Sequence, residues 1–345
     1  MSGDVMARGF PPPRPSPASA GEGAGALLQV RDLHTHFHTR AGVLKAVNGV
    51  SFTLHRGEIL GLVGESGSGK SVTGFSLIGL VDPPGRIASG SIRFDGQELV
   101  GLPQPRMRAL RGKRIAMVFQ DPAATLNPVL TIGTQMTLAV QAHGGGGERA
   151  ARELAARSLT RVGIPDAVAR LDAYPHEFSG GMRQRVAIAI ALLHEPELII
   201  ADEPTTALDV SIQAQILAEM KNLAKDSGTA LIWISHDLAT VSSLADRVMV
   251  MYAGRIVEHG PVAEVLRAPI HPYTRGLLDS LPALATPGGR LAQIPGSTPS
   301  LLSLPPGCPF APRCPRASDA CRSDPPAVGD ARHGALCHHP LEVVA

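Results

Sequence analysis

The chain has 345 residues, of which 44% are hydrophobic, and its formal net charge is +2. This length and composition suffice for one large domain and a second, smaller one. The small net charge and an aromatic content of 3% argue against a nucleic-acid-binding surface, which needs clustered cations and rings for base stacking.

The N-terminal residues 1–26 are rich in proline and glycine and contain no apolar segment of the kind found in signal peptides. They are predicted to form a disordered tail. The longest uninterrupted apolar run of the chain, residues 186–193, is far shorter than the roughly 18 to 20 residues that a membrane-spanning helix needs. We therefore expect a cytoplasmic location and a chain that does not cross a membrane by itself.

Residues 61–74, GLVGESGSGKSVTG, connect a strand-like apolar run to a predicted helix. Gly64, Gly67 and Gly69 allow successive backbone N–H groups to point into one cavity at a helix N-terminus, an arrangement that favours phosphate. Lys70 is predicted to contact the β- and γ-phosphates of a nucleotide, and the Ser71 hydroxyl to bind Mg²⁺. The alternative is a glycine-rich turn in which the Lys-Ser pair is incidental.

Polar residues also follow three other strand-like runs. Asp202 and Glu203 directly follow one apolar run, and Gln120 and His236 end the other two segments. Phosphoryl transfer needs a carboxylate that organises Mg²⁺ and a group that polarises the attacking water, which we assign to Asp202 and Glu203. Gln120 is predicted to contact Mg²⁺ or its water, and His236 to form a hydrogen bond with the γ-phosphate or to orient the water. The alternative for each residue is a structural role at a strand end.

A second anion site is predicted in the segment 178–196, FSGGMRQRVAIAIALLHEP. Ser179, Gly180 and Gly181 precede a long helical run that ends ahead of Pro196, so another helix N-terminus is available to an anion. One nucleotide is not easily enclosed by two such sites on separate modules of one chain. We therefore predict a dimer in which this segment contacts the γ-phosphate bound by the partner; the alternative is an ordinary helix N-cap.

Together these segments resemble the ATP-binding subunits of ABC transporters. GESGSGKS looks like the Walker A motif, Gln120 like the Q-loop residue, FSGGMRQR like the signature, LIIADE like the Walker B motif, ALD at 207–209 like the D-loop, and His236 like the switch histidine. The signature departs from its commonest form at Phe178 and Met182. Phe37 lies where the family stacks an aromatic ring on adenine, although a packing role, or contact by a neighbouring histidine, is the alternative.

The resemblance implies that Lys70, Glu203 and His236 are catalytic and that Ser71 and Gln120, with Asp202, hold Mg²⁺. The ATP-binding residues that it implies are Phe37, Gly64, Glu65, Ser66, Gly67, Ser68, Gly69, Lys70, Ser71, Gln120, Ser179, Gly180, Gly181 and Asp202.

Residues 271–282 and 294–315 resemble the C-terminal extension of oligopeptide and dipeptide importer ATPases. This implies an ATPase that powers peptide import as a peripheral protein on the cytoplasmic face of the membrane. The implied partners are a second ATPase subunit, transmembrane permease subunits and an extracytoplasmic solute-binding protein, with no nucleic acid. The alternatives are a soluble ABC-type ATPase acting on nucleic acid or ribosomes, and a regulatory protein that only binds ATP.

All four cysteines, Cys308, Cys314, Cys321 and Cys337, lie in the C-terminal segment with the spacing C-x5-C-x6-C-x15-C. This spacing is wider than that of a typical zinc site, although four thiolates suit either zinc or an iron-sulfur cluster. Peptide importer ATPases with this tail carry a [4Fe-4S] cluster, so the resemblance favours a cluster over zinc and over unliganded thiols.

The predicted fold is therefore an α/β P-loop NTPase of the ABC ATPase type. It has an antiparallel β subdomain, an inserted helical subdomain and a small C-terminal metal-binding domain. We expect a disordered tail over residues 1–26 and an ATPase domain over 27–267, with its helical insert at about 121–190. The importer extension with the four cysteines is expected over 268–345.

Overall fold

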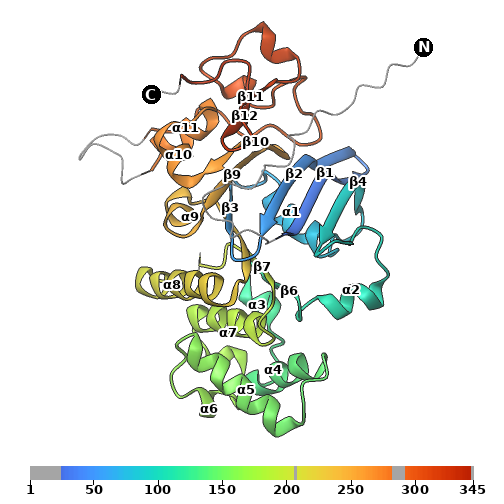
Figure 1. Ribbon diagram of the computed structural model, residues 1–345, viewed down its shortest axis with the longest axis vertical. Helices are drawn as coiled ribbons and strands as arrows, with labels where there is room; N and C mark the ends of the chain where they lie inside the picture. The colour runs from blue at the N-terminus through green and yellow to red at the C-terminus, as the bar shows by residue number, and fades with distance from the viewer. Residues whose placement is uncertain (1–24, 206–207, 282–291, 343–345) are drawn as a thin grey trace. The chain divides into compact units, whose positions relative to one another are not determined.

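The computed structural model of the protein describes residues 25–205, 208–281 and 292–342 and is drawn in Figure 1. Nearly all of the predicted tail, and the first residue of the segment at 207–209, lie outside these ranges. The chain divides into two compact units. The first comprises residues 1–55, 60–101 and 235–345, and the second residues 56–59 and 102–234.

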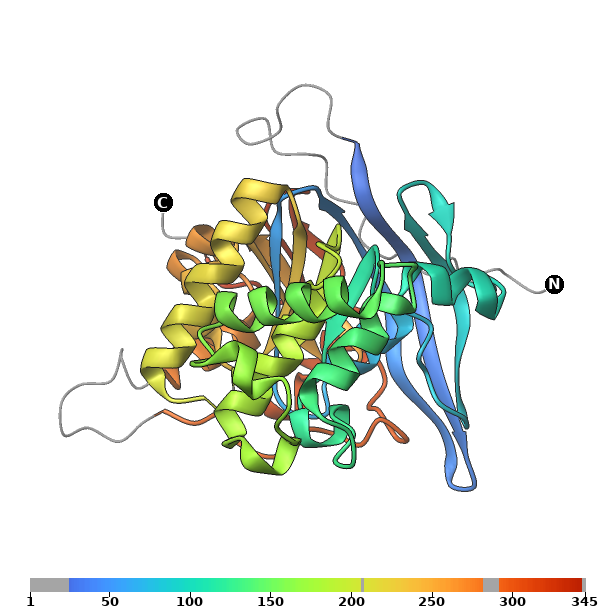
Figure 2. The same ribbon diagram turned by 90° about the horizontal axis from the view of Figure 1, so that it is seen from below.

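An antiparallel sheet with the strand order β2-β1-β4-β5 lies in the first unit. β1 (Ala26–Thr39) pairs on one side with β2 (Gly42–His55) and on the other with β4 (Gly85–Phe94), which pairs with β5 (Gln97–Glu98). Figure 2 shows β1 and β2 as a long hairpin. The sheet confirms the antiparallel β region expected near the N-terminus.

The strand that leads into the phosphate loop, β3 (Ile59–Val63), is apolar and lies beside another largely apolar strand, β9 (Arg247–Tyr252). The residues of β3 are all buried, and β3 pairs in parallel with β9. On its other side, β9 pairs antiparallel with β10 (Arg255–Pro261). The sheet then extends from β10 through β12 (Gly334–Leu336) to β11 (Ala327–Gly329).

Short helices complete the first unit, and α10 packs against β9 and β10 (Figure 1). These helices are α1 (Lys70–Leu77), α9 (Leu238–Leu244), α10 (Val262–Arg267), α11 (Pro272–Asp279) and the 3-10 turns η3 (Ala311–Arg313) and η4 (Asp319–Arg322).

The second unit contains a parallel sheet in which β7 (Leu198–Asp202) pairs with β6 (Ile115–Val118) and with β8 (Ala230–Ser235). Every residue of β7 and β8 is buried, which explains their continuous apolar sequence. The parallel arrangement brings the carboxyl ends of these strands to one edge, where the predicted polar residues follow them.

Helices fill the part of the chain between β6 and β7, where the sequence predicts a helical insert at about residues 121–190. α5 packs against α4, α6 and α7, and Figure 1 shows these helices grouped together. Ala151, Ala155 and Leu159 of α5 are fully buried at intervals of four residues, the spacing of one helix face. The helices and turns between β6 and β7 are α3 (Pro122–Thr125), α4 (Ile132–Gln141), α5 (Glu148–Arg161), α6 (Ala167–Arg170), η1 (Pro175–Glu177) and α7 (Gly180–Leu192), while α2 (Gln104–Leu110) precedes β6.

α8 (Val210–Ser227) follows the carboxylates and has sharply defined ends. The Asp209 side chain accepts a hydrogen bond from the Ile212 N–H at 3.0 Å, and Gly228 ends the helix with a φ of +68°. Among the helices of the described ranges, α8 included, none is both long and apolar enough to cross a membrane.

Candidate active site

The phosphate loop begins where β3 ends and runs through residues 64–69 to the first residue of α1. A Cβ atom on Gly64 would lie 2.1 Å from the Met251 carbonyl oxygen. At Gly69, φ is +105° and a Cβ would lie 2.1 Å from the Ala46 carbonyl oxygen. Because both contacts are with backbone, only glycine permits this path. Ser66 and Gly67, at the tip, are exposed.

Lys70 is the first residue of α1 and its side chain turns back into the loop. The residue is 5% exposed, and its Nζ donates to the carbonyl oxygens of Gly64, at 2.7 Å, and Glu65, at 2.9 Å. The Ser68 hydroxyl is buried and has no hydrogen-bond partner within the part of the chain that the structure describes. Ser71 lies in the first turn of α1. A buried cation, an unsatisfied hydroxyl and a helix N-terminus together fit a phosphate group.

Two other predicted residues belong to the same unit. His236 is exposed in the turn between β8 and α9. Phe37 lies on β1 opposite Leu44 and Gly85, where a Cβ on Gly85 would come within 2.5 Å of the Phe37 ring. The Phe37 ring thus packs against the backbone of β4 while the residue stays partly exposed.

The acidic pair lies in the second unit at the end of β7. Asp202 is 1% exposed. Glu203 has the left-handed φ of +46°, and its N–H donates to the Ile234 carbonyl oxygen at 2.9 Å. The Gln120 side chain, which follows β6, donates through Nε2 to Glu203 Oε2 at 3.3 Å. The structure therefore brings Gln120 and Glu203 together, because β6 and β7 are adjacent parallel strands.

The signature segment forms the N-terminus of α7 in the same unit. The Ser179 hydroxyl caps the helix by accepting a hydrogen bond from the Met182 N–H at 3.3 Å. Phe178 is buried, whereas Ser179 and Gly180 are exposed. Arg183 donates through Nε to the carbonyl oxygens of Pro175 and Phe178, which holds the approach to the helix. The tip of α7 is thus a fixed and accessible helix N-terminus.

Three residues of the C-terminal segment contact the phosphate loop, and none was predicted from the sequence. The Tyr273 hydroxyl accepts a hydrogen bond from the Glu65 N–H at 2.9 Å, and the Thr298 hydroxyl donates to Glu65 Oε2 at 3.1 Å. The Arg313 guanidinium binds the same carboxylate with two nitrogens, at 2.6 and 3.0 Å. The sequence identified this segment by family resemblance, but no local pattern signalled its contact with residue 65.

The Glu65–Arg313 pair has an electrostatic effect on the loop. Burial raises the pKa of the Glu65 carboxyl group, but the hydrogen bonds and charge of Arg313, with smaller contributions from Thr298 and Lys70, together outweigh burial, so the pKa lies below its ordinary value. The carboxylate is therefore charged at neutral pH, and the ion pair is formed.

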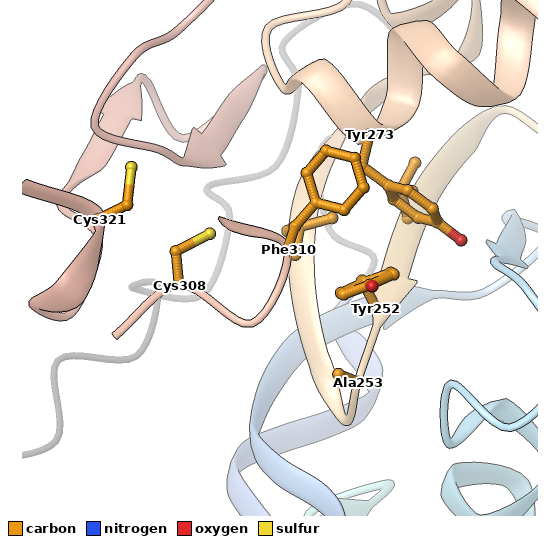
Figure 3. Packing of buried hydrophobic residues seen from close by; sticks show 8 residues of the cluster. Tyr252, Ala253, Tyr273, Cys308, Phe310 and Cys321 are labelled. Carbon is orange, nitrogen blue, oxygen red and sulfur yellow. The ribbon is translucent and has the colours of Figure 1, made fainter. Parts of the chain in front are cut away.

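Two of the cysteines, Cys308 and Cys321, belong to a buried cluster that also contains Tyr252, Tyr273 and Phe310. In Figure 3, Cys308 lies between Cys321 and the Phe310 ring. The Cys308 N–H donates to the Cys321 carbonyl oxygen at 2.9 Å. The four thiols influence one another electrostatically, since each of the other three contributes to the raised pKa of the Cys337 thiol.

The predicted metal-binding character of this segment is not supported by the structure. Burial is the main cause that raises the pKa of the Cys308, Cys314 and Cys337 thiols, that of Cys337 to about 11. Across the described ranges, no group of three or more His, Cys, Asp or Glu side chains is arranged to hold a metal ion. Cys308 and Cys321 contribute to a packed core.

Comparison with known families gives two matches along the chain. The family described as ABC transporter matches residues 47–206, and the family described as oligopeptide/dipeptide transporter, C-terminal region, matches residues 257–321. These matches include the phosphate loop, the signature and the acidic pair in the first case, and Tyr273 and Arg313 in the second.

The chain is also similar to characterised transport proteins over most of its length. It is 50% identical to the oligopeptide transport ATP-binding protein OppD of Salmonella typhimurium over 300 residues, covering 87% of this chain and 89% of the relative. It is 46% identical to the dipeptide transport ATP-binding protein DppD of Escherichia coli over 319 residues, covering 92% and 98%.

Solved structures show the same fold. The cbiO1 component of an ABC transporter complex from Clostridium perfringens has a TM-score of 0.58 and 28% identity, and covers 70% of this chain and 90% of that one. A bacterial ABC transporter cassette solved as a dimer has a TM-score of 0.63 and 24% identity, covering 68% and 98%.

Proposed function

The chain belongs to the family of ATP-binding subunits of oligopeptide and dipeptide ABC transporters, and we propose how its residues divide the work of ATP hydrolysis. It is the ATP-hydrolysing subunit of a peptide importer. The observation that carries this conclusion is a phosphate loop with a buried Lys70, in a chain half identical to an oligopeptide transport subunit. The match to the peptide-transporter C-terminal region favours this function over an ATPase that acts on nucleic acid or ribosomes.

ATP binding is assigned to the loop and the first turn of α1. The backbone N–H groups of residues 64–71 and the Ser68 hydroxyl surround the phosphates, and Lys70 exchanges its contacts with loop carbonyls for the β- and γ-phosphates. This exchange is favourable because a phosphate oxygen carries more charge than a carbonyl oxygen. Phe37 is assigned to stacking on the adenine ring. The partial exposure of Phe37 on β1 supports this assignment.

Hydrolysis is assigned to Ser71 of α1 and to the polar residues at the carboxyl ends of β6, β7 and β8. Ser71, Gln120 and Asp202 supply hydroxyl, amide and carboxylate oxygens, the ligands that Mg²⁺ prefers. When bound, Mg²⁺ neutralises charge on the β- and γ-phosphates. Glu203 polarises the attacking water and accepts its proton, and the hydrogen bond from Gln120 orients that carboxylate. His236 donates a hydrogen bond to the γ-phosphate.

The active assembly is proposed to be a dimer with ATP at the shared surface. Ser179, Gly180 and Gly181 of one subunit contact the γ-phosphate held by Lys70 of the other, which is supported by the exposed, capped N-terminus of α7. The second subunit is either a copy of this chain or a related one. The assembly lies peripherally on the cytoplasmic face of the membrane, bound to permease subunits that receive peptides from a solute-binding protein.

The domain boundaries follow from the same proposal. The ATPase domain spans residues 27–267, its helical insert at about 121–190 contacts the permease, and the importer extension spans 268–345. A [4Fe-4S] cluster or zinc at Cys308, Cys314, Cys321 and Cys337 is proposed from the sequence resemblance and from the mutual electrostatic influence of the four thiols. Anaerobic purification followed by a visible spectrum and metal analysis tests it, and a colourless, metal-free protein would refute it.

The main experiment is co-purification of the chain with its permease. The complex is then reconstituted in liposomes, and ATP turnover is measured with candidate solute-binding proteins. ATP turnover is expected to rise when the binding protein carries a peptide and to be lost in the Glu203→Gln variant. Turnover that no peptide-loaded binding protein stimulates would contradict the importer function. Full turnover in Glu203→Gln would contradict only the assignment of that residue.

A further inference from the structure

Arg313 is held unusually firmly for an arginine. It is 7% exposed, and its Nε donates to the Pro295 carbonyl oxygen at 2.8 Å, while Nη1 donates to the Tyr252 hydroxyl at 3.3 Å. The guanidinium also lies over the rings of Tyr252 and Phe310, at 5.8 and 6.0 Å from their centroids. Nη2 also donates to the Ile294 carbonyl oxygen at 3.4 Å, so the guanidinium is fixed on several sides while both Nη atoms bind Glu65.

Glu65 connects this fixed cation to the residue that would bind phosphate. Arg313 engages both carboxylate oxygens of Glu65, and the Glu65 N–H is bound by Tyr273. The Glu65 carbonyl oxygen in turn accepts the hydrogen bond from Lys70 Nζ at 2.9 Å. Side chain, N–H and carbonyl of Glu65 are all restrained, so the loop segment that carries Lys70 is positioned from the C-terminal segment.

We propose that Arg313 is a positioning residue for ATP: through Glu65 it holds the phosphate loop in its binding-competent conformation before the nucleotide arrives. This inference rests on the proposed role of the loop in ATP binding. A loop that is competent only part of the time binds its ligand with an affinity reduced by that fraction, whereas a preorganised loop avoids the cost of ordering. Once the phosphates are bound, they order the loop themselves.

This sequence of events predicts a specific kinetic signature. Arg313→Met removes a charged, two-point hydrogen bond, so KM for ATP is expected to rise about tenfold. The rate constant kcat is expected to stay within about twofold, because the bound nucleotide restores the loop. Arg313→Lys keeps the charge without the planar two-point geometry and is expected to raise KM by an intermediate factor.

The matched control is Arg255→Met. Arg255 also joins the core of this unit to the C-terminal segment, through an ion pair with Asp324 at 3.0 Å, but it does not touch the loop. We expect its KM for ATP to equal that of the wild type. Glu65→Gln weakens the same ion pair from the Glu65 side. In the double variant Glu65→Gln/Arg313→Met, the two increases in KM should not multiply, since each change removes the same contact.

The experiment is a steady-state ATPase assay of the full importer complex, with the thermal unfolding midpoint of each variant recorded in parallel. A raised KM with unchanged kcat, absent in Arg255→Met, supports the proposal. A purely structural role lowers the midpoint and kcat at unchanged KM, and that result overturns it, as do multiplicative effects in the double variant. If Arg313→Met does not fold, Arg313→Lys decides in the same way. Absence of ATPase activity in the wild type would instead refute the proposed function.

Discussion

Substituting Gly69 by alanine tests the physical basis of the phosphate loop most directly. At φ +105° an L-residue is strained, at a cost of about 1–2 kcal/mol. The added methyl would also lie 2.1 Å from the Ala46 carbonyl oxygen and 2.8 Å from the Met251 methyl. Crowding of this kind costs about 1–3 kcal/mol in a packed interior. The total is about 2–5 kcal/mol, unless the loop moves.

If the loop moves to relieve the contact, the phosphate site is distorted instead. The crowding component then appears as weaker ATP binding, by about tenfold to a hundredfold. Gly101→Ala is the matched control, because Gly101 has φ +75° and a Cβ there meets nothing within 4 Å. It should show only the backbone strain, about 1–2 kcal/mol, and unchanged ATP affinity.

The assay combines urea unfolding with binding of a fluorescent ATP analogue for both variants. Gly69→Ala is expected to lose stability, affinity or both relative to Gly101→Ala. Equal stability and equal affinity in the two variants would show that the Ala46 carbonyl does not constrain the loop, and the reasoning from its distance would be refuted.

Three further outcomes are expected. Glu203→Gln should lower steady-state phosphate release by about 10²–10⁴-fold with ATP binding retained, and turnover near the wild-type rate would contradict the assignment. Ser179→Ala and Thr131→Ala each remove an N-cap hydrogen bond, of 3.3 and 3.2 Å, and about 1 kcal/mol, but only Ser179→Ala should impair ATP-driven dimerisation, measured by light scattering. Burial lowers the pKa of His259 and His271 to about 4, so between about pH 6.5 and 4 the unfolded chain binds protons that the folded chain excludes. As the pH falls through this range, the free energy of unfolding should decrease by about 3 kcal/mol for each residue. A free energy of unfolding in urea that does not change over this range would contradict it.

Much of the fold and part of the site were determined by local sequence. Gly228 stops α8 because only glycine takes the left-handed conformation easily, and Ser179 caps α7 because a serine hydroxyl reaches an N–H three residues ahead. In both cases the deciding interaction lies within a few residues, so residue type and spacing were sufficient.

Other features were decided only by the tertiary structure. Gly67 and Gly69 look alike in the sequence, but only Gly69 lies against the Ala46 carbonyl. The family resemblance favours a metal site at the cysteines, but that Cys308 packs in a core with aromatic rings follows only from the path of the chain. Glu65 meets Arg313 from 248 positions away, and no local pattern encodes such a contact, because it exists only once the whole chain has folded and brought both side chains to one point.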